Sequence, residues 1–328
     1  MKLAALVVTF NRPEALAVTL DRLFAEEVDH VVVVDNASSP ETPALLAGLT
    51  DPRLHVIRLE DNTGGAGGFE TGLRHIRDVI DPDWTVLMDD DARPAQGAFG
   101  LFRREYAAID PSSVAANALG VVAAAVFFPD GDLCEMNRPS RNPFWHFNLF
   151  MRTVFLGGRS GFHLSDADFA PDAPATDIDV ASFVGYFISR GGVRRTGLPE
   201  GGMFIYGDDV TYSLRLRRTG GRIMLDPAIR FEHDCRTLGE GLATRPLWKV
   251  YYLCRNGVSI AGMAAGRLLF PFALTWYLIA WTRKTRHYSA AERPLYRKML
   301  WRGVRDGLLG RRGRNDAIHA LAQTAPLS

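Results

Sequence analysis

Three consecutive aspartates, Asp89, Asp90 and Asp91, follow an apolar, strand-like run in the segment VLMDDDARP. Adjacent carboxylates repel one another, so the cluster stabilises nothing unless a positive charge lies beside it. Carboxylate oxygens gathered at a strand end suit a hard divalent cation, Mg²⁺ or Mn²⁺, that bridges to phosphate oxygens. A helix N-cap with exposed acids is the ordinary alternative. Three acids directly after a buried strand favour the metal.

A second acidic pair, Asp208 and Asp209, lies in the segment FIYGDDVTY at the predicted start of a helix. One carboxylate there can act as a general base while its neighbour tunes the local charge. Capping of the helix N-terminus is the common alternative. His233, in the segment RFEHD after a predicted strand, can bind a metal through a neutral imidazole. A single histidine is nevertheless more often structural.

The segment NTGGAGGF, residues 62–69, holds a cluster of glycines after a predicted strand. Glycines there permit either a close backbone approach to a ligand or a tight turn packed against the sheet. The residues leave both readings open, with the next helix beginning at Glu70 or beyond. The cluster lacks the Lys-Ser/Thr of an ATPase phosphate loop. The turn after the first strand, TFNRPE, lacks the glycines of a dinucleotide fold.

These residues are positioned by alternating strands and helices in the first half of the chain. Continuous apolar runs are typical of parallel strands that are covered on both faces. The predicted strands are residues 3–10, 30–38, 54–60 and 83–91, and the predicted helices are residues 11–24 and 70–80. This βαβ rhythm predicts an α/β fold with a Rossmann-like, mostly parallel open sheet and flanking helices. Ligands bind at the carboxyl ends of the strands in such sheets, where the polar clusters lie.

The middle of the chain is less regular, and the end is helical. Further strands are expected at residues 120–128 and 181–190, a helix at 207–220, and a short strand pair at 222–234. The acidic, proline-containing stretch at residues 163–179 is expected to be a mobile loop. From about residue 246 the chain is predicted to be wholly helical. We therefore expect a catalytic domain at residues 1–245 and a helical, basic region at residues 246–328.

Composition limits the class of protein. The chain has 328 residues, of which 47% are hydrophobic, so it can build a sizeable core. A net charge of +1 argues against a dedicated nucleic-acid binder. The three cysteines, Cys134, Cys235 and Cys254, show no zinc-type spacing and indicate a reducing compartment. The apolar N-terminus lacks a cleavage pattern and is expected to be a strand rather than a signal peptide.

The segment LLFPFALTWYLIAW, residues 268–281, is uncharged and aromatic, and it is short for a membrane span. Between Arg283 and Arg314 there are eleven Lys/Arg against two acids. An apolar, aromatic segment beside a basic run is typical of a helix lying in an anionic membrane interface. A core helix, or a helix packing on a second copy of the chain, is the alternative. The membrane interpretation predicts a cytoplasmic protein held peripherally at the inner face of the cell membrane.

The order of the motifs TFNRPE, DNAS, NTGGAGGF, DDD, GDD, EH and YYLCRNG resembles inverting family 2 glycosyltransferases, which have the GT-A fold. The resemblance covers roughly residues 3–257. The pair NTGGAGGF and DDD is most similar to the galactofuranosyl- and rhamnosyltransferases of bacterial cell-surface polysaccharide synthesis. It implies a nucleotide-sugar donor, UDP-galactofuranose ahead of dTDP-rhamnose, a Mn²⁺ or Mg²⁺ cofactor, and a glycan or lipid-linked acceptor.

The resemblance also assigns roles to residues. For the donor it implies Thr9, Asn11, Arg12, Asp35, Asn36, Asn62, Gly64, Gly65, Gly67, Gly68 and Asp90. For the metal it implies Asp89, Asp91 and His233, and for the base it implies Asp209 with Asp208 beside it. Similar galactofuranosyl polymerases carry tryptophans at the acceptor site, where this chain has Phe183 and Tyr186.

Two other classes of protein compete with this interpretation. A sugar nucleotidyltransferase also has an α/β sheet and a carboxylate-bound metal, but it typically has a basic glycine-rich loop after the first strand. Here that turn offers only Arg12. A non-catalytic scaffold of the same fold is the third class, and the intact acids count against it.

Overall fold

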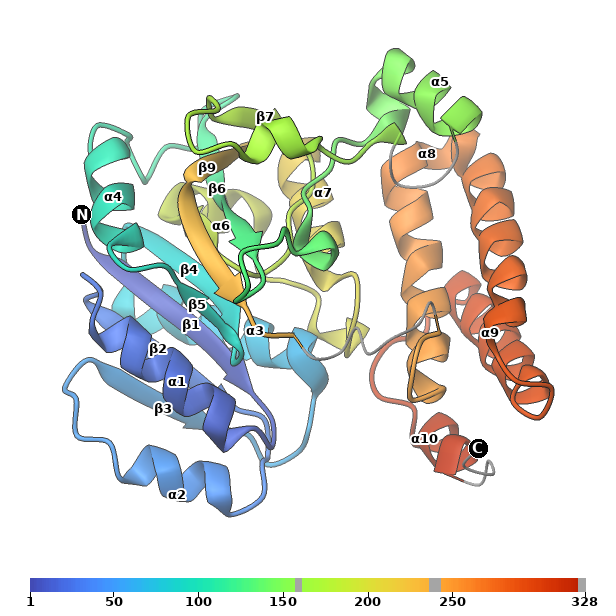
Figure 1. Ribbon diagram of the computed structural model, residues 1–328, viewed down its shortest axis with the longest axis horizontal. Coiled ribbons are helices and arrows are strands. Elements are labelled where there is room, and N and C mark those ends of the chain that lie inside the picture. The colour runs from blue at the N-terminus through green and yellow to red at the C-terminus, as the bar shows by residue number, and fades with distance from the viewer. Residues whose placement is uncertain (157–160, 236–242, 324–328) are drawn as a thin grey trace.

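The computed structural model describes residues 1–156, 161–235 and 243–323, and its centre is one large curled sheet (Figure 1). All seven residues of the first strand are buried, as the continuous apolar run predicts for a strand covered on both faces. The strands are β1 (Leu3–Thr9), β2 (His30–Asp35), β3 (Leu54–Arg58), β4 (Trp84–Asp89), β5 (Ala92–Pro94), β6 (Leu119–Phe127), β7 (Thr176–Ile178), β8 (Tyr186–Ser189) and β9 (Arg222–His233).

The strand order is β3-β2-β1-β4-β8-β6-β9-β5, with β7 added alongside β9. The first four strands are parallel, which confirms the βαβ prediction for the N-terminal half. Beyond β4 the pairing is mixed, because β8 is antiparallel to both of its neighbours while β6 and β9 are parallel. The prediction of a mostly parallel sheet therefore holds for the half formed by β1 to β4 only.

Helices cover both faces of the sheet. One face packs against α1 (Pro13–Phe24), α2 (Glu41–Ala47) and α4 (Ala98–Glu105). The other face packs against α3 (Gly64–His75), α6 (Arg190–Thr196) and α7 (Asp208–Arg218). A single π-helical turn, Ile76–Ile80, extends α3. The layering is that of a doubly wound α/β domain.

Three local predictions are corrected by the structure. Residues 222–233 form the single strand β9, whose pairing with β6 slips by a bulge between Asp226 and Arg230, rather than two short strands. The acidic stretch at 163–179 contains a 3-10 turn, Asp166–Phe169, and the strand β7. Only Tyr186–Ser189 is extended within residues 181–190.

The C-terminal region is helical, as predicted, and it forms its own core. It contains α8 (Trp248–Lys284), α9 (Arg293–Leu308) and α10 (Asp316–Gln323). Aromatic residues of these helices gather in a third hydrophobic cluster that also includes Phe204, which precedes α7. The helix α5 (Phe147–Leu156) lies against the end of this bundle (Figure 1), and Asn142 just before it donates to the Ala264 carbonyl at 2.9 Å.

The helix α8 is folded back on itself at Gly266, whose φ of 69° and ψ of 178° are not helical. A Cβ built on Gly257 would lie 2.5 Å from the Trp281 ring, and one built on Gly262 would lie 3.8 Å from the Phe270 ring. In an unbroken helix Gly257 and Trp281 would be about 36 Å apart. The chain therefore reverses, giving a first arm (residues 248–265) and a second arm (residues 267–284).

Candidate active site

The predicted site residues meet at the carboxyl ends of β1, β2 and β4, beside the end of β9. Asp89 is the last residue of β4, and the short strand β5 follows it directly. Because β5 pairs with β9 so that Ala92 lies opposite His233, the histidine is brought beside Asp91. Residues 142 positions apart in sequence thus form one site.

Asp89, Asp91 and His233 lie close enough to hold one cation. One ligand atom from each lies within 4.8 Å of the other two. His233 Nε2 lies 3.1 Å from Asp91 Oδ1, and both side chains are at least 96% buried. Two carboxylates and one imidazole form a donor set that suits Mn²⁺ and, less completely, Mg²⁺.

The protonation of this group reflects buried like charges. Burial, with the charges of Asp91 and Asp90 added, raises the pKa of Asp89 to about 7 despite the opposing effect of His233. Burial opposes the charged form of His233, but the hydrogen bond to Asp91 and the nearby Asp89 raise its pKa to about 10. Burial likewise opposes the charged form of Asp91, yet its bonds to His233 and Arg12 hold its pKa below the ordinary value. A positive charge beside this group is therefore favourable.

Arg12 and Thr9 determine the position of the middle aspartate. Arg12 bridges Asp90 at 3.1 Å and Asp91 at 2.8 Å, and the Thr9 hydroxyl donates to Asp90 Oδ2 at 2.8 Å. Burial raises the pKa of Asp90 to about 6, against the lowering effect of Arg12 and Thr9. Asp90 thus points toward the end of β1, away from the group of three.

Asn137 orients His233 from the side opposite Asp91, and the sequence prediction missed it. Its Oδ1 lies 2.7 Å from His233 Nδ1, and its Nδ2 donates to the Ser182 hydroxyl at 2.8 Å. The second bond fixes which end of the amide faces the histidine. With Nδ1–H donating to Asn137, Nε2 is the ring nitrogen that faces Asp91, and it is the one left to bind a metal once its proton is lost. Nothing in the sequence around Asn137 indicates this contact.

The ends of β2 and β3 form the other side of the site. Asp35 is 1% exposed and is paired with Arg58, a residue that the sequence prediction did not include. Asn36 donates to the Gly64 carbonyl at 2.8 Å and accepts from the Thr63 amide at 2.8 Å. These contacts tie the second strand to the glycine cluster.

Two further residues that were predicted to bind the sugar donor stabilise the surrounding turns. Asn62 accepts a bond from the Gly64 amide at 2.8 Å. Asn11, at a φ of 56°, accepts from the Ser39 amide at 2.7 Å through its side chain. Both side chains therefore connect the loops that follow the parallel strands.

The glycine cluster is the first turn of α3 rather than a loop that ends at Glu70, so the predicted helix start is wrong by six residues. Gly64 has a φ of +75°, and a Cβ there would lie 2.0 Å from the Phe204 carbonyl oxygen. A Cβ on Gly68 would lie 2.4 Å from Val8 of β1. Close packing therefore requires glycine at both positions. The site for a Cβ on Gly65 has no neighbour within 4 Å, so its backbone is accessible.

Asp208 and Asp209 begin α7, on the loop that faces the aspartate cluster. Burial, with the charge of Asp209 added, raises the pKa of Asp208 to about 8, and burial raises the pKa of Asp209 to about 6. The charge of Asp89 contributes to the first shift and that of Asp209 to the shift of Asp89. At neutral pH the more readily ionised member is Asp209, as a base requires.

The loop before this pair is strained and is held from α8. Phe204 and Tyr206, each at a φ of 66°, lie in a left-handed region that non-glycine residues rarely adopt. Asn256, in the YYLCRNG motif, donates to the carbonyls of Met203, Ile205 and Tyr206 at 2.8–3.0 Å. The motif therefore supports the loop that carries the acidic pair.

Phe183 and Tyr186, the predicted acceptor residues, are not at an open surface. They are 4% and 0% exposed and pack edge to face against each other, and Phe183 also packs edge to face against Phe69. In this conformation neither ring can stack on an acceptor. Of the aromatic residues near the acidic pair, Tyr206 is 39% exposed.

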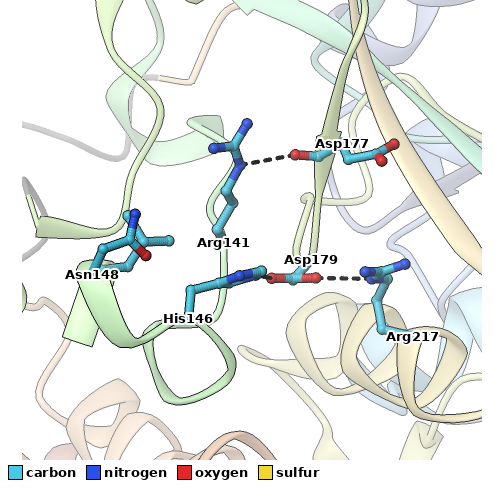
Figure 2. Close-up of a pocket in the computed structure, with 7 residues that line it drawn as sticks. Arg141, His146, Asn148, Asp177, Asp179 and Arg217 are labelled. Carbon is cyan, nitrogen blue, oxygen red and sulfur yellow. Dashed lines mark hydrogen bonds and ion pairs between the residues drawn. The ribbon is translucent and has the colours of Figure 1, made fainter.

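A polar cavity of about 230 Å³ lies apart from these residues, between the start of α5, β7 and the end of α7 (Figure 2). Asp179 in its wall is already bonded to Arg217 at 2.8 Å and to His146 at 3.2 Å. Arg141 donates to the Asp177 carbonyl at 3.0 Å. Both acids of the cavity wall are thus already paired with arginines, because Asp177 also bonds Arg222.

Known proteins share this sequence pattern and fold. Residues 4–157 match the family model for glycosyl transferase family 2. Galactofuranosyltransferase GlfT1 from Mycolicibacterium smegmatis is 27% identical over 322 residues, which cover 94% of this chain and 96% of that protein. GlfT1 from Mycobacterium tuberculosis is 41% identical over 91 residues, covering 26% of this chain and 29% of that protein.

Solved structures agree with the fold. TarS from S. aureus, solved with UDP-GlcNAc, is 14% identical with a TM-score of 0.56, covering 98% of this chain and 84% of that one. The mannosyltransferase PcManGT from Pyrobaculum calidifontis, solved with GDP-Man and Mn²⁺, is 16% identical with a TM-score of 0.51, covering 98% and 87%. The fold is of the GT-A type, residues 4–157 are a family 2 glycosyltransferase domain, and the protein is a glycosyltransferase.

Proposed function

We propose that this enzyme is an inverting, metal-dependent glycosyltransferase that transfers a sugar, UDP-galactofuranose being the best donor, to a glycan or lipid-linked acceptor. The observation that carries the proposal is the convergence of two acidic groups. Asp89, Asp91 and His233 form one group, and Asp208 with Asp209 forms the other, close enough for their charges to interact. Such a site can hold a nucleoside diphosphate on one side and deprotonate a hydroxyl on the other.

The chain's own residues suit a divalent cation on the diphosphate side. Asp89, Asp91 and the Nε2 atom of His233 would hold it, and the raised pKa of Asp89 marks a carboxylate in need of a positive neighbour. A bound Mn²⁺ or Mg²⁺ supplies Lewis-acid neutralisation of the leaving diphosphate. Arg12, 41% exposed beside Asp91, adds a second positive charge at the same place.

On the acceptor side, Asp209 takes the proton of the attacking hydroxyl. Its carboxylate is partly buried and receives the Val210 amide at 2.7 Å through Oδ1, which leaves Oδ2 for the substrate. Asp208, protonated more readily, keeps the pair from carrying two negative charges at neutral pH. Attack from the face opposite the diphosphate inverts the anomeric centre.

The donor preference rests on the relatives. Two galactofuranosyltransferases match the chain, one of them over almost its whole length. The nucleotide would lie along the ends of β1 and β2, near Thr9, Asn11, Asp35 and Asn36, with Asp90 near its ribose or sugar. The accessible backbone of Gly65, at the start of α3, would lie near the diphosphate. dTDP-rhamnose is the second donor to test.

The enzyme is proposed to act at a membrane surface. By length and composition, one described helical stretch, Trp248–His287, qualifies as a membrane span. It reverses at Gly266, however, and the first arm is largely buried in the helical core. The second arm exposes apolar residues on one helical face, at Leu268 (90%), Phe272 (72%), Trp276 (45%) and Ile279 (47%). This face supports peripheral binding rather than a crossing.

Helix α5 extends the exposed apolar surface. It lies against the end of the bundle (Figure 1), where Asn142 donates to the Ala264 carbonyl, and it exposes Phe147 by 80% and Phe155 by 77%. The basic residues of α9 and its flanks supply charge complementary to anionic lipid headgroups, each contributing about 1 kcal/mol near such a surface. A lipid-linked acceptor would then be presented to a site held at the membrane.

A donor screen tests the catalytic proposal. The purified enzyme with UDP-galactofuranose and an acceptor should release UDP when Mn²⁺ is present and should release none in excess EDTA. Asp91→Asn should lose this activity, whereas Asp21→Asn, an exposed acid on α1, should keep it. Pyrophosphate release from UTP and a sugar phosphate would instead establish a nucleotidyltransferase. Full activity in excess EDTA would refute the metal.

A further inference from the structure

Two buried cysteines lie on the Asn137 side of His233, although they are 101 positions apart in the chain. Cys134 and Cys235 are 2% and 7% exposed, and their sulfur atoms are 3.8 Å apart. The fold brings them together because β6 and β9 are parallel neighbours. Cys134 follows the turn after β6, and Cys235 follows the end of β9.

These two cysteines and His233 form a second group capable of holding a metal. One ligand atom from each of the three lies within 4.8 Å of the others. In a tetrahedral zinc site with Zn–S bonds of about 2.3 Å, two sulfurs are about 3.8 Å apart. The observed sulfur separation therefore already matches that of a bound thiophilic ion.

The donor atoms differ in kind from those of the carboxylate group. Two thiolates and an imidazole are soft ligands that select Zn²⁺ and its heavier relatives, whereas carboxylates select Mg²⁺ and Mn²⁺. Asn137 Oδ1 accepts from the Cys134 thiol at 3.0 Å and faces His233 Nδ1 at 2.7 Å. The Cys134 thiol and His233 Nδ1 are therefore both directed at Asn137 Oδ1. A metal bound there would replace both protons.

We infer that Cys134, Cys235 and His233 form a thiophilic metal site that competes with the carboxylate group for His233. A neutral imidazole has one lone pair to offer. If Nδ1 binds Zn²⁺, both thiol protons leave to solvent and the imidazole proton lies on Nε2, where it donates to Asp91 at 3.1 Å. His233 is then unable to serve Asp89 and Asp91. Zinc binding is therefore inhibitory.

The binding test uses Cd²⁺, whose bonds to thiolates give a charge-transfer absorption in the ultraviolet. Reduced, metal-free protein titrated with Cd²⁺ should show this band, saturating at one equivalent. Cys134→Ser and Cys235→Ser should each weaken Cd²⁺ binding by more than the roughly ten- to hundredfold cost of losing an outer-shell partner. Cys254→Ser, which alters the buried cysteine of α8, should bind as wild type.

Two results would overturn the site. They are the absence of a band in folded wild-type protein and an unchanged band in both cysteine variants. Circular dichroism of each variant shows that it is folded, and because each cysteine is tested separately, misfolding of one variant does not decide the matter.

Inhibition is the functional consequence, and it rests on the proposed function. Zn²⁺ should inhibit nucleotide release competitively with Mn²⁺, and Cys134→Ser should raise the inhibitory Zn²⁺ concentration at least about tenfold while activity without zinc is unchanged. Equal inhibition of Cys134→Ser and wild type would contradict the competition. If no donor supports nucleotide release, the glycosyl-transfer proposal fails while the Cd²⁺ titration still decides the metal site.

Discussion

His233 is held from both sides, so its two neighbours determine how its ring faces the proposed metal ligands Asp89 and Asp91. Asp91 faces its Nε2 atom and Asn137 faces its Nδ1 atom. The charges on Asp91 are further balanced by Arg12. An outer partner that fixes the histidine tautomer raises the affinity of the ligand atom on the other side of the ring.

Replacing Asn137 by Ala should therefore weaken Mn²⁺ without damaging the chemistry itself. We expect the Mn²⁺ concentration for half-maximal activity to rise about 10- to 100-fold, with turnover near wild type at saturating metal. Ser182→Ala, which removes only the hydroxyl that Asn137 donates to, should cause a smaller shift. A loss of turnover that no Mn²⁺ concentration restores would indicate a structural role instead.

The catalytic base should be visible in the pH dependence of the rate. Asp209 has a pKa raised to about 6 by burial, so protonation removes the base as the pH falls below that value. The rate should rise with pH through about 6 and then level off. Asp209→Asn should lower turnover by about 10² to 10⁴-fold with donor binding retained. A larger loss in Asp208→Asn would identify that residue as the base.

At the scale of elements, the helical region acts on the active site through the loop before α7. The first arm of α8 supplies Asn256, which bonds three carbonyls of this loop, and Arg255, which bonds the Met203 carbonyl at 2.8 Å. Non-glycine residues at positive φ cost about 1–3 kcal/mol each, so the loop persists only while it is held. The C-terminal helices thus support the loop that carries Asp208 and Asp209.

We expect Asn256→Ala to lower turnover at least about tenfold by releasing this loop, with the KM for the donor little changed because the donor contacts lie elsewhere. The buried carbonyls left without donors should cost about 1–3 kcal/mol of stability. Asn148→Ala, an exposed asparagine by the polar cavity, is the matched control and should change neither quantity. Wild-type turnover in Asn256→Ala would show that the loop holds itself.

At the scale of the whole molecule, buried acids make the metal-free protein sensitive to pH. The folded pKa values of Asp89, Asp90 and Asp208 lie at about 7, 6 and 8, above their unfolded values, and that of His233 is raised to about 10. The folded state therefore binds more protons than the unfolded state, so stability falls as pH rises above about 4.

The melting temperature of metal-free protein should accordingly be lower at about pH 8 than at about pH 5. Mn²⁺ should raise it more at the higher pH, where Asp89 is ionised and can bind. Asp208→Asn should reduce the difference between the two pH values. A melting temperature that increases across this interval without metal would contradict the buried charges.

The exposed face of the second arm predicts reversible binding to anionic membranes. The protein should float with phosphatidylglycerol vesicles at low salt and detach at high salt. Phe272→Glu combined with Trp276→Glu should abolish flotation while nucleotide release with a soluble acceptor is retained. Val18→Glu, on α1 and 50% exposed, is the matched control. If the wild-type protein does not bind such vesicles and elutes as a dimer in size-exclusion chromatography, the exposed face of the second arm packs against a second subunit instead.

The sequence by itself determined the layered α/β half of the fold and the types of residue in the site. Alternating apolar runs and turns report local periodicity, which is why β1 to β4, α1 and α7 are where they were predicted. The acids at the end of β4 and the start of α7 could also be picked out from the sequence, because carboxylates clustered after a buried strand repel one another unless a positive charge lies beside them.

Only the tertiary structure decided which distant residues meet. Strand pairing brings His233 to Asp91, and the parallel pairing of β6 and β9 brings Cys134 to Cys235 although their spacing indicates no zinc site. The reversal at Gly266 likewise leaves the apolar face of the second arm exposed. The periodicity of apolar residues predicts only the helix or strand in which a residue lies. Contacts across the fold depend on register and chain reversal, which are set by packing among all the elements.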